Sequence, residues 1–175
     1  YQWAEAPDGM EHGATVLFSG PSHAAAREAQ TDLAQHYGIG AELWSATSYK
    51  KLREEALSQE RWNRLHPHDS PRVPMVTRLL GNAPEVVVGV TDYMRLVPDQ
   101  IARWVPGSFT SLGTDGYGRS DTREALRGFF ETNAGHVVVA TLSALALEGH
   151  IDANLVTDAI ARYGIDPDVA DPWTR

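Results

Sequence analysis

The sequence ATVLFSGPSHAAAREAQTDLAQHYGIGAELWSA, residues 14–46, contains two apolar segments with an alanine-rich amphipathic segment between them. The first apolar segment is almost continuous, which is typical of a strand buried on both faces of a sheet. We expect a strand at 14–19 ended by Gly20-Pro21-Ser22, a helix at about 23–37 closed by Gly38-Ile39-Gly40, and a strand at 41–46. The short connections predict a βαβ unit with parallel strands and a right-handed crossover.

Further elements of the same two kinds follow along the chain. After an irregular proline-rich stretch at 65–74, the pattern repeats strand and helix until the C-terminal third, which is mostly helical. We expect helices at about 49–63 (capped by Ser48), 74–80, 93–104 (kinked at Pro98), 122–130, 134–148 and 153–163, with strands at 85–90 and 109–112. Residues 136–141 have strand propensity, but the length of the surrounding Leu/Ala pattern favours a buried helix. The sequence therefore predicts an α/β fold: a three-layer sandwich around a mostly parallel, doubly wound sheet.

Composition limits the classes of function. The chain has 175 residues, a formal net charge of −8 and no cysteine. This length suits a single domain, and the charge argues against nucleic acid and against an anionic membrane surface as partners. The absence of cysteine removes disulfides and thiolate chemistry and suits a cytoplasmic protein. Because the sequence starts Tyr1-Gln2-Trp3-Ala4 without a methionine, we expect a fragment of a longer chain.

The segment GTDGYGRSDTRE, residues 113–124, is the strongest candidate for a functional loop. Three glycines within six residues indicate backbone that needs positive φ or close approach, and a hydroxyl and acidic cluster then starts a helix. A ligand loop and a docking loop both remain open, and the docking interpretation is favoured. The candidate contact residues are Asp115, Gly116, Tyr117, Gly118, Arg119, Ser120 and Asp121, with Tyr117 as an amphipathic anchor and Arg119 as a bidentate donor.

Two other segments are weaker candidates. Gly20, Ser22 and His23 lie at the carboxyl end of the first strand and could bind an anion at a helix N-terminus, although a simple helix cap is the favoured interpretation. His66, His68 and Asp69 could bind a metal, but the flanking prolines favour a rigid exposed turn. Charged pairs such as Arg127/Glu131 are expected to be solvated helix faces. The sequence contains no recognisable combination of a nucleophile, a base and a residue that orients the base. The chain alone is therefore not predicted to catalyse a reaction.

Several segments together resemble one enzyme family. These are 113–124, YGIGAELWSATS at 37–48, ERWNRLHP at 60–67, PRVP at 71–74, TDYM at 91–94 and GHID at 149–152. They are similar to the C-terminal domain of the homodimeric bacterial pyruvate dehydrogenases, whose last domain is also related to that of transketolases. The resemblance covers almost the whole chain.

The resemblance implies a role within a larger enzyme. Members of the family have two domains that bind thiamine diphosphate and magnesium, followed by a smaller C-terminal α/β domain with a mixed sheet. They decarboxylate pyruvate and transfer the acetyl group to a lipoyl group of the dihydrolipoyl acetyltransferase component. In the family, Gly-Asp-Gly and Asn-Asn segments hold the cofactor, and both are missing from this sequence. Thr114-Asp115-Gly116 is similar to the first of them only in part and lies in a different element. We therefore expect residues 1–175 to be one C-terminal domain with no catalytic, cofactor-binding or metal-binding residue, which supports the homodimer. The alternative is an independent anion- or nucleotide-binding module.

Overall fold

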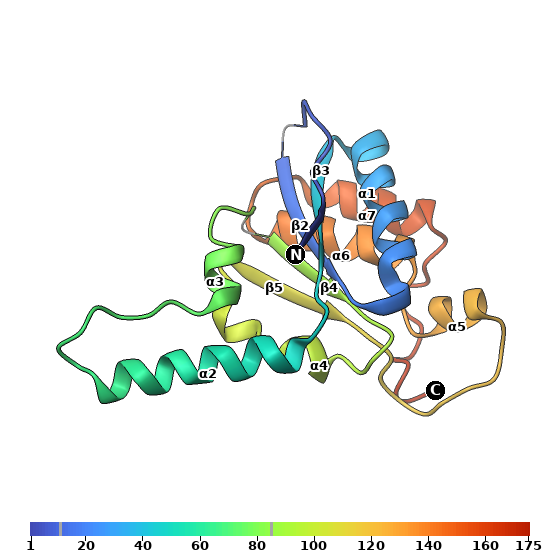
Figure 1. The fold of residues 1–175 in the computed structure, drawn as a ribbon. Helices are drawn as coiled ribbons and strands as arrows, with labels where there is room; N and C mark the ends of the chain where they lie inside the picture. Colours follow the sequence, from blue (N-terminus) through green and yellow to red (C-terminus); the bar gives the residue numbers. More distant parts are fainter. Residues whose placement is uncertain (11, 85) are drawn as a thin grey trace.

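The computed structural model describes residues 1–10, 12–84 and 86–175, which form a five-stranded sheet between two layers of helices (Figure 1). The strands are β1 (Gln2–Ala4), β2 (His12–Phe18), β3 (Ile39–Ser45), β4 (Val86–Val90) and β5 (Ser108–Leu112). Their order in the sheet is β1-β3-β2-β4-β5. Only β1 is antiparallel to its neighbour, β3, among these strands. The sheet is thus mixed but mostly parallel, as predicted.

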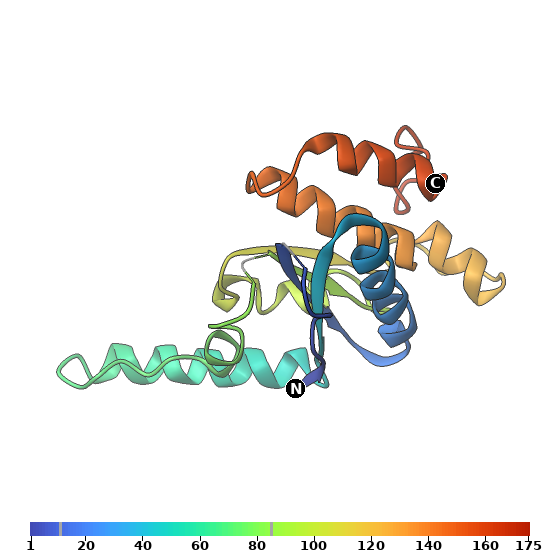
Figure 2. The ribbon, with the colours of Figure 1, turned by 90° about the horizontal axis from the view of Figure 1, so that it is seen from above.

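Helices cover both faces of the sheet. The helices are α1 (His23–Tyr37), α2 (Tyr49–Leu65), α3 (Met75–Leu79), α4 (Leu96–Asp99), α5 (Arg123–Phe129), α6 (Ala134–Leu147) and α7 (Ala153–Arg162), with short 3₁₀ turns at Gly20–Ser22 and Ala102–Trp104. Helices α1, α6 and α7 lie on one side of the sheet, and α2 and α3 lie on the other (Figure 2). The three-layer α/β sandwich is confirmed, and residues 136–141 are helical as expected.

The packing of strand β2 shows why the sequence from Ala14 to Phe18 is almost continuously apolar. Val16 and Phe18 belong to the core that the sheet forms with α1 and α6, whereas Leu17 belongs to the core beneath α2 and α3. Successive strand residues point to opposite faces, so a central strand covered on both sides is expected to be apolar at nearly every position. This double burial fixes β2 at the centre of the sheet.

Two elements differ from the sequence prediction. The expected helix at 93–104 is wrong: the chain forms only α4 and a later 3₁₀ turn. The carbonyl of Tyr93 accepts a hydrogen bond from the backbone N–H of Thr114 at 2.9 Å, so it is not available to begin a helix. Strand β1 is absent from the prediction because its three residues at the edge carry no periodicity that distinguishes them.

Gly38 alone caps α1, with φ 67°, and Ile39 already belongs to β3. The predicted strand start at Glu85 lies outside the described residues.

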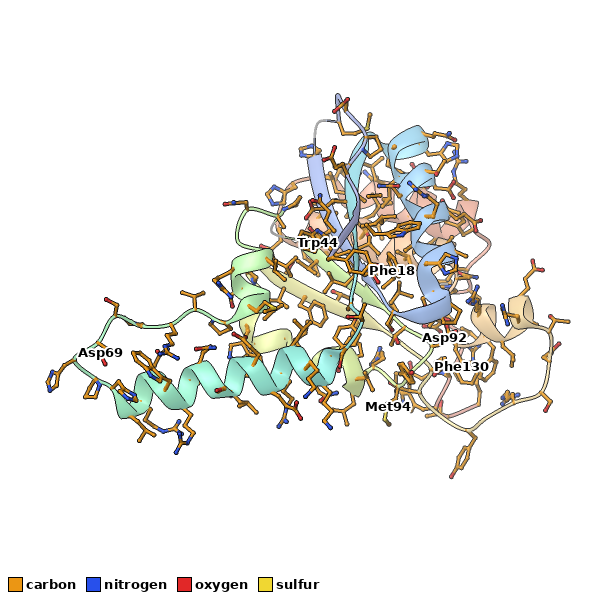
Figure 3. The ribbon with its side chains drawn as sticks, viewed as in Figure 1. Phe18, Trp44, Asp69, Asp92, Met94 and Phe130 are labelled. Atoms are coloured by element: carbon orange, nitrogen blue, oxygen red, sulfur yellow. The ribbon has the colours of Figure 1, made fainter. Side chains whose placement is uncertain are left out.

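Helix α2 extends beyond the sheet and, with the returning loop 66–74, forms an arm (Figure 1). Near its far end, Asn63 and the backbone of Arg72 exchange hydrogen bonds of 2.7 and 2.9 Å, which join the two limbs. The Trp62 ring lies between the His66 ring, stacked at 4.4 Å, and the Arg72 guanidinium at 3.8 Å. Figure 3 labels Asp69 at the tip of this arm. Its end is therefore an ordered structure, although it lies away from both cores.

Tyr49, at the start of α2, provides a test of the core beneath α2 and α3. Its side chain is buried, and its hydroxyl has no hydrogen-bond partner among the described residues. Burial raises the pKa of Tyr49 above its usual value. The Tyr49 hydroxyl ionises near pH 10 in the unfolded chain but stays protonated in the folded chain. Its effect is therefore to lower the free energy of unfolding as the pH rises above 10.

We expect Tyr49→Phe to be neutral or to stabilise the protein by about 1 kcal/mol at pH 8, because it removes an unpaired buried hydroxyl. It should also reduce the loss of stability between pH 10 and 11 by up to about 1 kcal/mol. Urea denaturation at the three pH values measures both effects. Tyr117→Phe, at an exposed position, is the control and should leave the pH dependence unchanged. A Tyr49→Phe protein that loses stability at pH 8 would show that the hydroxyl is paired.

Candidate functional site at the carboxyl edge of the sheet

Three strands end side by side at one edge of the sheet. The neighbouring strands β2, β4 and β5 are followed by Ser19, Thr91 and Gly113, respectively. Strand β3, which comes next in the sequence, lies on one side of β2 in the sheet, and β4 lies on the other side of β2. The strand order therefore reverses at this edge, between β2 and β4. Such a point is where open α/β sheets bind their ligands. The Oγ atoms of Ser19 and Thr91 lie 2.6 Å apart and connect the ends of β2 and β4.

Asp92 connects the two segments that the sequence analysis singled out. Its Oδ1 accepts a hydrogen bond from Ser22 Oγ at 3.1 Å, and its backbone carbonyl accepts one from Thr114 Oγ1 at 2.7 Å. Arg127 of α5 lies 3.8 Å from the Asp92 carboxylate and donates to the Pro21 carbonyl at 2.9 Å. The turn at 20–22 and the glycine loop are therefore parts of one site (Figure 3, near the label of Asp92).

The first half of the glycine loop is fixed to its own chain. Asp115 accepts hydrogen bonds from the backbone N–H and from Nε of Arg95, at 3.0 and 3.1 Å. A Cβ atom at Gly113 would lie 2.6 Å from the Tyr93 carbonyl oxygen. Gly116 has a φ of 110°, and a Cβ there would lie 2.9 Å from the carbonyl oxygen of Pro172. The close approach that the glycines predicted thus occurs within the chain at Gly113 and Gly116.

The second half of the loop faces solvent. The Tyr117 side chain is 89% exposed. The guanidinium of Arg119 lies 4.1 Å from the centroid of the Phe129 ring, which holds this part of the loop against α5. Gly118, Ser120 and Asp121 are also exposed. The loop therefore presents an aromatic side chain on an anchored base.

A cavity of about 520 Å³ lies between the loop and α5. Three arginines line it, Arg119, Arg123 and Arg127, together with Asp92 and Asp121. Both charge signs are present, so the cavity is not a simple anion pocket. Phe130 and Thr132 also line it, and Figure 3 labels Phe130 in this region.

The predicted anion site at Gly20, Ser22 and His23 lies in the same region. Ser22 donates to Asp92, and His23 Nδ1 lies 3.3 Å from the carbonyl oxygen of Gly20. A carboxylate of the protein already contacts this turn, and an incoming anion would meet its charge. The anion site stays a prediction, with a weaker physical basis than the sequence suggested.

The histidines of the 66–74 loop lie far along the arm. His66 stacks on Trp62, and its Nδ1 lies 2.8 Å from the Trp62 carbonyl oxygen. Within the described ranges, no three histidine or acidic side chains gather in a way that could hold a metal ion. No helix in the described part of the chain has both the length and the apolar character needed to cross a membrane.

Sequence reasoning missed the roles of Asp92, Arg95 and Arg127. The predicted ion pair between Arg127 and Glu131 is wrong. The Arg127 guanidinium contacts Pro21 and Asp92, and Glu131 pairs with Arg175 at 3.4 Å. Asp92 carried one usable signal, since it is the second residue after the end of β4. Arg127 carried none, because the Pro21 carbonyl that it contacts is 106 residues away in the sequence.

Comparison with known proteins identifies the family. A model of the transketolase-like C-terminal domain matches residues 1–133. The chain belongs to the transketolase-like C-terminal domain family. The mixed sheet agrees with the one that the resemblance implied.

Similar bacterial proteins match this transketolase-like domain over nearly its whole length. It is 46% identical over 92% of its length to the pyruvate dehydrogenase E1 component of Pseudomonas aeruginosa, and 44% identical over 96% to that of Escherichia coli K12. It is 42% identical over 98% of its length to that of Mycobacterium tuberculosis. The domain spans only 18–19% of the length of these relatives.

Proposed function

We propose that this chain is the C-terminal domain of a thiamine-diphosphate-dependent pyruvate dehydrogenase, and that it supports the assembly of that enzyme without performing chemistry. The whole enzyme would decarboxylate pyruvate and transfer the acetyl group to the lipoyl group of a dihydrolipoyl acetyltransferase. Its other domains and a second subunit would be the direct partners of this domain, in the cytoplasm. The family match and the 42–46% identity to E1 components support this proposal.

The observation that carries the docking role is the division of the glycine loop into two halves. Contacts to Arg95 and Pro172 fix its first half, whereas Tyr117 extends into solvent with 89% exposure. Tyrosines on a rigid base are common anchors in protein interfaces, because little conformational entropy is lost when they bind. The loop is therefore suited to hold another domain or subunit.

Asp115 of this domain does not fit the role of a ligand for the magnesium that accompanies thiamine diphosphate. Both carboxylate oxygens of Asp115 contact Arg95, so its position in Thr114-Asp115-Gly116 does not make it a cation ligand. The cation would require further oxygen ligands, and the described residues offer no such cluster. The cofactor of the proposed enzyme would be held by domains outside this chain.

Tyr117→Ala in the full-length enzyme tests the docking role. We expect domain docking or dimerisation to weaken by about tenfold or more, because an interface anchor is lost. Analytical ultracentrifugation of the dimer and its thermal unfolding measure the effect, and Arg119→Ala should act in the same direction. Leu147→Ala, at an exposed position on α6, is the matched control. Unchanged dimer dissociation and unchanged melting in both loop variants would contradict the proposal.

A second candidate function is an independent anion- or nucleotide-binding module. The three arginines of the 520 Å³ cavity favour it, although Asp92 and Asp121 oppose it. Titration with inorganic phosphate, followed by amide NMR, separates the two candidates. Saturable shifts at 20–23 or 115–120 would support the module, and their absence would leave the docking role as the better account.

A further inference from the structure

A second surface of the molecule lies on the opposite face of the sheet from α6. It is a groove of about 480 Å³ between the end of β3, α2 and α3. Its floor is formed by buried apolar side chains, among them Leu17, Val76 and Ile101. Met75 and Leu79 line it with 41% and 45% of their surface exposed. Grouped exposed apolar side chains beside a groove indicate a surface that another segment covers.

The charged side chains at the rim already have partners within the chain. Lys51 Nζ lies 3.0 Å from Glu54, and Glu55 Oε2 accepts a hydrogen bond from the Met75 backbone N–H at 2.8 Å. A charged occupant would therefore find no free charge to pair with at these positions. The groove favours an apolar segment.

The direction of β1 shows which segment can reach the groove. Tyr1 and Ser45 exchange two backbone hydrogen bonds, of 2.9 and 3.0 Å, and continue the antiparallel pairing of β1 with β3. A residue that preceded Tyr1 would continue past Ala46 and Thr47, and both of these residues line the groove together with Tyr1 itself. Figure 2 places the N-terminus on the side of the sheet covered by α2.

We propose that, in the full-length enzyme, the segment immediately preceding residue 1 lies in the groove between α2 and α3. This inference rests on the proposed function, since the relatives are about five times longer than this domain and the family model describes a C-terminal domain. The segment would extend the pairing along the edge of β3 and cover Met75 and Leu79 with apolar side chains. Because it is tethered at Tyr1, its effective concentration at the groove is far higher than that of a second copy or of another protein.

Thiol labelling at Leu79 tests the proposal. The domain has no cysteine, so Leu79→Cys in the full-length enzyme introduces a site that peptide mass spectrometry can identify. We expect its labelling by a maleimide to be about tenfold or more slower in the native enzyme than in the urea-unfolded chain, because native labelling requires the segment to open locally. Leu147→Cys, 85% exposed on the other face, is the control that the reagent works on the native enzyme. Equal native and unfolded rates at Leu79→Cys would overturn the proposal.

A photo-crosslinking residue at position 79 then identifies the occupant. A cross-link to the segment just before residue 1 supports the proposal, whereas a cross-link to another domain or to a second copy overturns it. Pyruvate decarboxylation by the same protein separates this inference from the proposed function. If the enzyme decarboxylates pyruvate but Leu79→Cys is labelled at the unfolded rate, only the groove proposal is overturned. If Leu79→Cys is labelled slowly but the protein has no activity, only the proposed activity is overturned.

Discussion

Replacing Gly113 with alanine is expected to lower the free energy of unfolding by about 2–3 kcal/mol, because the new Cβ has no room. It would lie 2.6 Å from the Tyr93 carbonyl oxygen and 2.8 Å from the Arg95 backbone nitrogen. Both atoms belong to the backbone, so the clash cannot be relieved by rotation of a side chain. Relief would require separating the strand ends at β4 and β5, which the hydrogen bond from Thr114 to Tyr93 holds together.

Thermal unfolding measures this effect, and for a chain of this size the melting temperature should fall by roughly 5–10 °C. Gly118→Ala is the matched control in the same loop. A Cβ at Gly118 meets no atom within 4 Å and its φ is not positive, so the change should stay within about 0.5 kcal/mol. Equal melting temperatures for the two variants would show that the loop does not pack on residues 93–95.

The second large effect is expected from Asp115→Ala. This change removes two hydrogen bonds to Arg95, one of them to its backbone N–H, at 3.0 and 3.1 Å. We expect a loss of about 1–2 kcal/mol, since hydrogen bonds to a charged group are strong but this pair is partly exposed. The loop should lose its anchor, and trypsin should cleave after Arg119 faster than in the parent protein.

Asp121→Ala provides the comparison for Asp115→Ala. Asp121 is exposed and accepts a hydrogen bond from the neighbouring Thr122 N–H at 2.7 Å. This contact is local and does not join distant segments, so Asp121→Ala should leave cleavage after Arg119 nearly unchanged. Urea denaturation and a time course of proteolysis distinguish the two variants. An Asp115→Ala protein that resists trypsin as well as its parent would contradict the anchoring role.

The sequence predicted most of the sheet because local and global signals agree there. The apolar run in β2 reflects burial on both faces, and Ser48 caps α2 by accepting a hydrogen bond from Lys51 N at 3.2 Å. The expected helix at 93–104 was wrong because a carbonyl at its start bonds to Thr114, a contact that no local pattern encodes. Tertiary contacts override propensity in such segments.

The glycine loop was located correctly from its composition, but its internal contacts were not. Glycine spacing indicates close approach and does not say which surface approaches. Here Gly113 and Gly116 approach residues of the same chain, at Tyr93 and Pro172. The docking role of Tyr117 and of its neighbours up to Asp121 remains a prediction from exposure and chemistry.

The arm formed by α2 and the 66–74 loop has a mechanical consequence. A helix of 17 residues is a rod about 25 Å long, so turning the domain by about 10° displaces its far end by roughly 4 Å. The clamp between Asn63 and Arg72 prevents the two limbs from separating and absorbing that movement. A rotation of that size would therefore move the tip of the arm far enough to break or restore a contact there.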